Sequence, residues 1–271
     1  REYYEKRPDL FHVIIEQERQ YGKRGLLLPL CKQAQGKYIA FCDGDDYWID
    51  SFKLQKQFDF MEAHAEYSMC GTKTKLIYQD RIKKRIRRRR KEKCGDVSLN
   101  QLMWRNPYVT SSTFLKSSLV QDWIEISSKI NKKGWKMGDL PLFIFCTTKG
   151  NGYILQDITA CYRVLSNSAS HGNPKKMHVF RGGEVHIRLS LMKKLSIPYS
   201  SERILKSWVF LQIKDALVLK EFVPKRRLSF YWKFYWKGRV HPEPIRFVIM
   251  FGILRCFCWF NQKNTRSGDL N

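Results

Sequence analysis

The sequence predicts an α/β fold, with a sheet flanked by helices, followed by a helical C-terminal region rich in basic and aromatic residues. Residues 38–42 are apolar at successive positions, which is typical of a strand buried on both faces of a parallel sheet. Leu54, Phe58 and Met61 recur at the spacing of one helical face. From about residue 179 onward, long stretches mix apolar, aromatic and basic residues.

Apolar runs, turn residues and helical spacings predict the other elements in chain order. Strands are expected at residues 12–15, 68–80, within 107–115 and within 154–164. Helices are expected at residues 26–35, after residue 50, at 96–104 and 123–130, and in the stretches 185–195, 204–222 and 228–236. Asp50 and Ser51 supply side chains that suit the cap of the helix carrying Leu54.

Composition limits the classes of protein and of partner. Hydrophobic residues make up 43% of the 271 residues, which allows a substantial core and argues against a disordered chain. Lys and Arg total 50 against 25 Asp and Glu, a formal charge of +25 that favours anionic partners. The 8 cysteines form no C-x-x-C pair, which favours reduced thiols and a cytoplasmic protein, either free or at the inner face of the membrane.

An acidic cluster follows the apolar run at 38–42. Asp43, Asp45 and Asp46 come directly after it, and ligands of open α/β sheets bind at the carboxyl ends of strands. Carboxylates this close repel one another, and a hard cation such as Mg²⁺ or Mn²⁺ relieves the repulsion. The pattern therefore fits a metal-bound diphosphate. A solvated acidic turn that caps the next helix explains the bare D-x-D pattern equally well.

A longer string decides between these two interpretations. Residues 36–50 read GKYIAFCDGDDYWID and residues 53–57 read KLQKQ. This string resembles the family 2 glycosyltransferases, in particular a branch with a G-D-D-Y-W-x-D signature. The resemblance extends to about residue 175. It implies a GT-A fold in residues 1–178, and a D-x-D motif that holds a nucleoside-diphosphate sugar through a divalent cation. Residues 179–271 are then a helical extension.

The resemblance also implies roles for the acids. Asp43 would lie near the ribose, Asp45 would bind the metal, and Asp46 would lie beside the donor sugar or brace the loop. The string Gly138-Asp139-Leu140-Pro141-Leu142 resembles the segment in which the family places its catalytic carboxylate, at the start of a helix. An inverting transfer needs a general base, and Asp139 is the candidate. A turn residue at Asp46 and a helix N-cap at Asp139 are the structural alternatives.

Two further segments resemble parts of the family pattern. Tyr162-Arg163-Val164 and the polar residues after it resemble a Y-R-x-H segment, so Arg163 would contact phosphate or brace the loop. His171 would reach the diphosphate or the metal, or be an exposed loop histidine. Residues 106–112 resemble a stretch on the acceptor side, although a plain polar loop is the favoured interpretation there.

The front of the chain departs from the family pattern. Family members open with an apolar strand and a short polar turn that helps to hold the nucleoside, and neither is found before residue 12. We therefore expect a fragment or a truncated gene, with a nucleotide pocket that lacks one wall and binds nucleotide weakly or not at all in isolation.

Three basic or aromatic segments bear on partners. Residues 81–93 are strongly basic but carry no interleaved aromatics, so a solvated hairpin or loop is favoured and no nucleic acid is expected. Residues 230–237 mix aromatics with Lys, which suits peripheral contact with a membrane or the packing of a helical subdomain. The apolar stretch 245–260 spans about 16 residues, fewer than the ~20 that a spanning helix needs.

The leading functional prediction is a metal-dependent, inverting glycosyltransferase of polysaccharide biosynthesis. Its partners would be a nucleotide-sugar donor and a hydroxyl of a saccharide or lipid-linked glycan. The alternatives are an inactive, N-terminally truncated remnant, and a basic nucleic-acid-binding protein that only the net charge supports.

Overall fold

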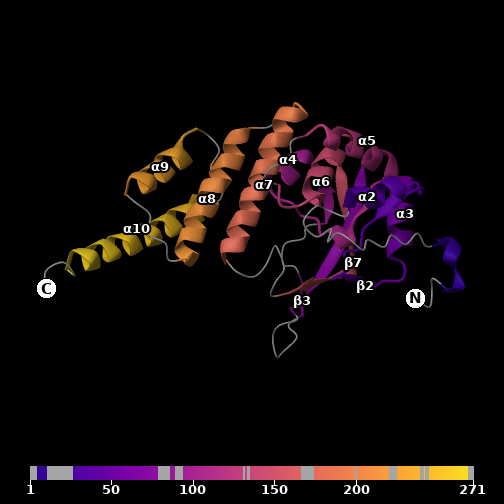
Figure 1. Cartoon of the computed structure of the whole chain (residues 1–271), viewed down its shortest axis with the longest axis horizontal. Coiled ribbons are helices and arrows are strands. Elements are labelled where there is room, and N and C mark those ends of the chain that lie inside the picture. Colours follow the sequence, from indigo (N-terminus) through magenta and orange to yellow (C-terminus); the bar gives the residue numbers. More distant parts are fainter. Residues whose placement is uncertain are drawn as a thin grey trace, which may run out of the picture.

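The structure is a computed structural model that combines a mixed sheet with a group of helices, and it confirms the predicted α/β fold. Figure 1 shows helices packed on the sheet and the longer C-terminal helices extending away from it. The structure describes residues 5–10, 27–78, 86–88, 94–130, 132, 135–165, 174–198, 200–219, 225–238, 241 and 244–267. The strand expected at 12–15 lies outside these ranges.

The described elements follow one another as an α/β part and then a helical part. The helices are η1 (Pro8–Leu10), α2 (Leu27–Gln33), α3 (Lys53–Ala63), α4 (Leu99–Trp104), η3 (Thr110–Ser112), α5 (Ser117–Ser128), α6 (Asp139–Thr147), α7 (Pro174–Lys194), α8 (Ser201–Leu219), α9 (Lys225–Trp236) and α10 (Pro244–Ser267). The strands are β1 (Tyr38–Ala40), β2 (Tyr47–Trp48), β3 (Met69–Tyr78), β4 (Ile86–Arg88), β5 (Gly95–Val97), β6 (Phe114–Lys116) and β7 (Gly152–Val164).

The sheet is organised around its two long strands. Its order is β1-β6-β3-β7-β2, with β4 paired to β3 and β5 paired to β7. β3 and β7 run parallel, and the other described pairings are antiparallel. The β3–β4 pairing places part of the basic run 81–93 in a hairpin, as predicted. The remainder of that run lies outside the described residues.

The strand before the acidic cluster differs from the prediction. β1 pairs antiparallel with β6, with Tyr38 opposite Lys116, and of its three residues only Ile39 is fully buried. The predicted parallel strand, buried on both faces, is therefore wrong for the described part of the sheet. The acids also do not lead directly into a helix, because β2 comes first and pairs with β7. Two residues are too few to show a strand pattern in the sequence.

The face that α3 buries was predicted only in part, since Met61 is buried as expected. Lys53, Gln57 and Met61 are buried, whereas Leu54 and Phe58 are 41% and 42% exposed. The polar side chains can be buried because they are satisfied. The Lys53 ammonium donates to Gln57 Oε1 at 2.6 Å, and Gln57 Nε2 donates to the carbonyl of Ser112 at 3.0 Å.

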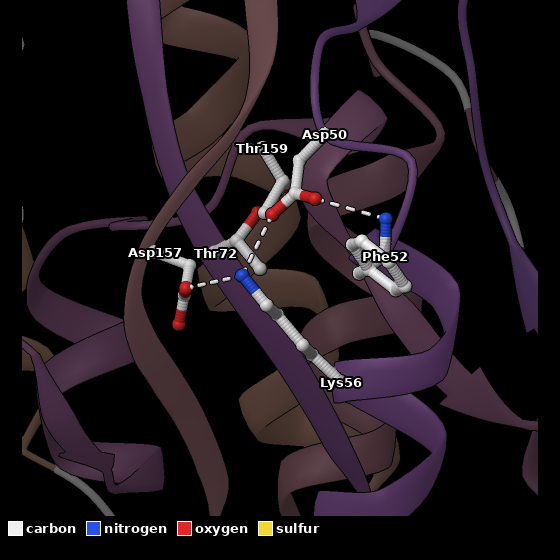
Figure 2. A network of polar contacts seen from close by, with 6 residues as sticks. All are labelled: Asp50, Phe52, Lys56, Thr72, Asp157 and Thr159. Carbon is white, nitrogen blue, oxygen red and sulfur yellow. Dashed lines mark hydrogen bonds and ion pairs between the residues drawn. The ribbon is translucent and has the colours of Figure 1, made fainter.

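A lysine joins α3 to the sheet (Figure 2). Lys56 Nζ lies 2.8 Å from Asp50 Oδ2 and 2.6 Å from Asp157 Oδ1 on β7. The other oxygen of Asp50 accepts a hydrogen bond from the backbone N–H of Phe52 at 2.9 Å, so Asp50 organises the turn that precedes α3. Below it, the Thr72 and Thr159 hydroxyls are 2.6 Å apart and join β3 to β7.

The C-terminal helices are continuous with the α/β part. The boundary placed at 178/179 lies inside α7, which packs on α6. Ile187 and Leu191 of α7 belong to the same hydrophobic cluster as the buried α6. A second cluster lies among α8, α9 and α10, where the rings of Tyr235 and Phe247 stack. None of the helices in the described part of the chain is both long and apolar enough to cross a bilayer.

A close backbone contact at the end of α6 supplies a test of the fold. A Cβ on Gly150 would lie 2.5 Å from the Glu66 carbonyl oxygen and 3.3 Å from the Ser68 nitrogen. Because both are backbone atoms, Gly150→Ala should lower the free energy of unfolding by about 1–3 kcal/mol, measured by urea denaturation. Gly182→Ala on α7, where a Cβ meets nothing within 4 Å, is the control and should cause no loss. Equal losses in both variants would contradict the packing described.

Candidate functional site

Asp46 holds the acidic loop in place. Its side chain is buried, with 6% exposed. One carboxylate oxygen accepts a hydrogen bond from Ser111 Oγ at 2.7 Å, and the other accepts from the backbone N–H of Arg163 at 3.0 Å. The Asp46 N–H itself donates to the Asp43 carbonyl at 2.9 Å. Burial raises the pKa of Asp46 above its usual value, and the hydrogen bonds from Ser111 and Arg163 offset only part of this shift. Asp46 therefore braces the loop against η3 and β7.

The other two acids of the cluster remain on the surface. Asp43 and Asp45 are both exposed, and the carbonyl of Asp45 accepts a hydrogen bond from Arg163 Nε. The Arg163 guanidinium also lies 5.6 Å from the ring centre of Tyr47. Arg163 thus stabilises the loop from β7, through its backbone and its side chain. The carboxylates of Asp43 and Asp45 are the ones that a ligand can approach.

Asp139 begins α6, as its sequence context predicts. The cap position belongs to Gly138, and no side chain caps this helix. The alternative role of Asp139 as an N-cap is therefore wrong. Its Oδ2 instead accepts a hydrogen bond from Thr110 Oγ1 of η3 at 3.0 Å. A carboxylate in the first turn is also favoured by the positive end of the helix dipole.

One cavity of about 630 Å³ brings these segments together. Asp43 and Asp139 both line it, although they lie far apart in the sequence, and Asn106 and Thr110 line it beside them. The Asp43 side chain is accessible but lines the cavity, and the partial loss of its hydration there, followed by the charges of Asp46, Asp139 and Asp45, raises the pKa of Asp43 to about 6. The cavity therefore has an acidic end at the edge of the sheet.

The C-terminal helices form the remaining wall of this cavity. Its cationic lining residues are Arg105, Arg181, Lys214 and Arg246, the last three from α7, α8 and α10. Arg181 is held by Asp215, with 2.6 Å between Nη1 and Oδ1. These residues were not predicted from the sequence, where the net positive charge was the available signal. Their meeting depends on how the helices pack.

The segment 106–112 is not merely the plain polar loop that the sequence favoured, because it orients two acids. Consecutive hydroxyl residues of η3 hold two different acids, since Thr110 donates to Asp139 and Ser111 donates to Asp46. The run of hydroxyl residues before an apolar strand was the available signal. It was insufficient because their acidic partners are distant in sequence.

Several residues of the GDDYW-x-D…KLQKQ string support η3. Trp48 Nε1 donates to the Ser111 carbonyl at 2.8 Å, next to the Gln57 bond to Ser112. The Lys53 ammonium lies 4.5 Å from the centre of the Trp48 ring, and burial lowers the pKa of Lys53 to about 8. Much of the string is thus scaffold for the segment that orients Asp46 and Asp139.

The predicted metal ligands are placed only in part. Asp45 is exposed at the loop, and His171 lies outside the described residues. Within the described ranges, no three His, Cys, Asp or Glu side chains gather as a metal site. Mg²⁺ commonly takes only one or two protein carboxylates and completes its shell with water and substrate phosphates. The exposed carboxylate of Asp45 fits that mode of binding.

Residues 1–121 match the sequence model of Glycosyl transferase family 2. This part of the chain is therefore similar to that family. The uncharacterized protein Rv1520 of Mycobacterium tuberculosis is 34% identical over 140 residues, 52% of this chain and 35% of the relative. The putative teichuronic acid biosynthesis glycosyltransferase TuaG of Bacillus subtilis is 38% identical over 69 residues, 25% of this chain and 27% of TuaG. The chain thus spans about a third of the length of these curated relatives.

The fold also has a counterpart among solved structures. The crystal structure of S. aureus TarS 1–349 in complex with UDP-GlcNAc superposes with a TM-score of 0.52. The superposition covers 86% of this chain and 66% of TarS at 14% sequence identity. At this identity the similarity shows the fold alone, and it confirms the GT-A fold expected from the resemblance.

Asp46 braces the loop, whereas Asp43 is the acid that a ligand can approach, so replacing each with Ala should have opposite effects on stability. Asp46→Ala leaves a buried hydroxyl and a backbone N–H without their acceptor, so the free energy of unfolding should fall by about 2 kcal/mol. Asp43→Ala is the matched control. Within the described residues no hydrogen bond reaches the Asp43 carboxylate, and loss of hydration together with the neighbouring charges raises its pKa to about 6, so this variant should keep or gain stability at pH 7. Urea denaturation in metal-free buffer measures both, and an equal loss would contradict the assignment.

Proposed function

We propose that the chain transfers a sugar from a nucleoside-diphosphate sugar to a hydroxyl of a saccharide or lipid-linked glycan, with inversion. The family match and the fold support this class of reaction. The observation that carries the proposal is the shared cavity, which places the exposed acid Asp43 and the helix-initiating acid Asp139 along one space. Such a space accommodates a donor at one acid and an acceptor at the other.

The donor end is the acidic loop. TarS was solved with UDP-GlcNAc, so a uridine-diphosphate sugar is the first donor to test. We assign the diphosphate to a divalent cation, Mg²⁺ or Mn²⁺, at Asp45, with Asp43 directed to the ribose. When bound, this cation supplies positive charge to the diphosphate as it leaves. The loop itself is held independently of any cation, because Asp46 and Arg163 tie it to η3 and β7.

Asp139 is assigned the role of general base. Thr110 donates to Oδ2, which fixes the carboxylate and leaves Oδ1 for the acceptor hydroxyl. In a single displacement, the acceptor oxygen bonds to the anomeric carbon while the bond from that carbon to the diphosphate oxygen breaks. The hydroxyl proton passes to Asp139, and the nucleoside diphosphate carries away the electron pair.

Asp139→Asn tests the base. Turnover, measured as UDP release from UDP-GlcNAc with Mn²⁺ and a membrane-lipid extract as acceptor, should fall by about 100-fold or more. The affinity for UDP, measured by calorimetry, should remain unchanged because Asp139 does not hold the donor. Asp59→Asn, which changes an exposed acid on α3, should leave turnover unchanged. Full turnover by Asp139→Asn would refute the assignment, and no release from any UDP-sugar would refute the proposed reaction.

Asp45→Asn tests the cation. This variant should require at least about tenfold more Mn²⁺ for half-maximal turnover, since a carboxylate ligand is replaced by a neutral amide. Its unfolding midpoint should match that of the parent, because the Asp45 side chain is exposed. An unchanged Mn²⁺ requirement would show that the cation does not bind at Asp45.

A further inference from the structure

The helix α10 carries two apolar faces, and the other residues that the structure describes cover only one of them. Phe247, Phe251, Leu254 and Cys258 are buried in the cluster with α8 and α9. The exposed apolar side chains are even more numerous. Ile245, Ile249 and Ile253 are 75%, 56% and 55% exposed, and the same outer face includes Val248, Gly252, Cys256 and Trp259.

Helical geometry gathers these exposed residues into one surface. At 3.6 residues per turn, positions 245, 248, 249, 252, 253, 256 and 259 fall within an arc of about 140°. The buried positions lie on the opposite side of the helix. Arg255 is exposed at one edge of this arc, and Arg246, which also lines the cavity described above, falls at the other edge. We call the arc and its two arginines the α10 outer face.

The charge of this region is of one sign. The sequence of α10 contains 4 basic residues and no acidic residue, and the whole chain carries +25. An apolar arc bordered by arginines is the arrangement of helices that lie in the plane of a membrane interface. The apolar residues enter the acyl boundary, and the guanidinium groups remain among the headgroups.

The alternative occupants fit less well. A second copy packed through the same face would bring arginine-bordered helices together, on chains that each carry +25. An anionic bilayer satisfies the apolar arc and the positive charge at once. Its plane also suits a straight helix, and Figure 1 shows α10 extending at the end of the molecule away from the sheet.

The aromatic stretch 230–237 contributes less than the sequence suggested. Tyr231 and Tyr235 are buried in the helical cluster, which agrees with the packing alternative for those two residues. Phe230 and Trp232 of α9 remain partly exposed. The larger continuous apolar surface therefore belongs to α10 rather than to α9.

We infer that the α10 outer face binds the surface of a lipid bilayer that carries anionic headgroups, with the helix lying in the plane of the interface. This contact goes beyond the proposed sugar transfer and needs neither donor nor cation.

Vesicle flotation of the full chain tests the inference. The chain should float with vesicles of phosphatidylcholine mixed with phosphatidylglycerol, less with phosphatidylcholine alone, and less at high salt. The double variant Ile249→Asp/Ile253→Asp should weaken binding by about tenfold or more. Val218→Asp, which alters a 55%-exposed valine on α8, is the matched control and should float like the parent.

Three further results decide the outcome. Arg255→Gln should weaken binding to the anionic vesicles while binding to phosphatidylcholine alone stays the same. Circular dichroism and urea midpoints should match the parent for all variants, because the replaced side chains are exposed. Failure of the parent to float with anionic vesicles overturns the inference. So does sedimentation velocity that shows a dimer abolished by the double variant, since the face then binds a second copy.

Discussion

The candidate site depends on one buried carboxylate. Asp46 accepts hydrogen bonds from Ser111 and from the backbone of Arg163, and it thereby joins three segments that meet only in the folded chain. A buried carboxylate without such partners would be strongly destabilising, so the loop, η3 and the end of β7 are constrained to form together. The position of Asp139 follows from the same join, because its partner Thr110 precedes Ser111 in η3.

The residues of the GDDYW-x-D…KLQKQ string have two kinds of role: some can contact a ligand, and the others support the loop. Trp48 and Gln57 each donate to a carbonyl of η3, and Lys53 lies beneath the Trp48 ring. These contacts keep η3 in place, and Ser111 of η3 in turn donates a hydrogen bond to Asp46. Only Asp43 and Asp45 are left facing outward with carboxylates for a ligand. Most residues of this string therefore serve to hold one loop in place.

Sequence reasoning succeeded where local pattern decides structure. β3 and β7 were predicted because long apolar runs carry a clear signal, and the helix start at Asp139 was predicted from the family resemblance of its segment. The buried face of α3 was predicted only in part because Gln57 is satisfied by carbonyls distant in sequence, which periodicity cannot reveal. The short β2 left no pattern to detect. The cationic wall of the cavity was missed for a related reason, since it is assembled from three separate helices.

One rigid element serves both the cavity and the outer surface of the molecule. Arg246 lines the cavity near the start of α10, and the whole helix spans 24 residues, about 36 Å. If α10 rests on a bilayer, the height of the cavity above the lipid is set by the helix itself. The site would then select acceptors by their length, because only a hydroxyl at that distance from its lipid anchor reaches Asp139. Search for such acceptors also becomes diffusion in two dimensions, confined to the plane that holds them.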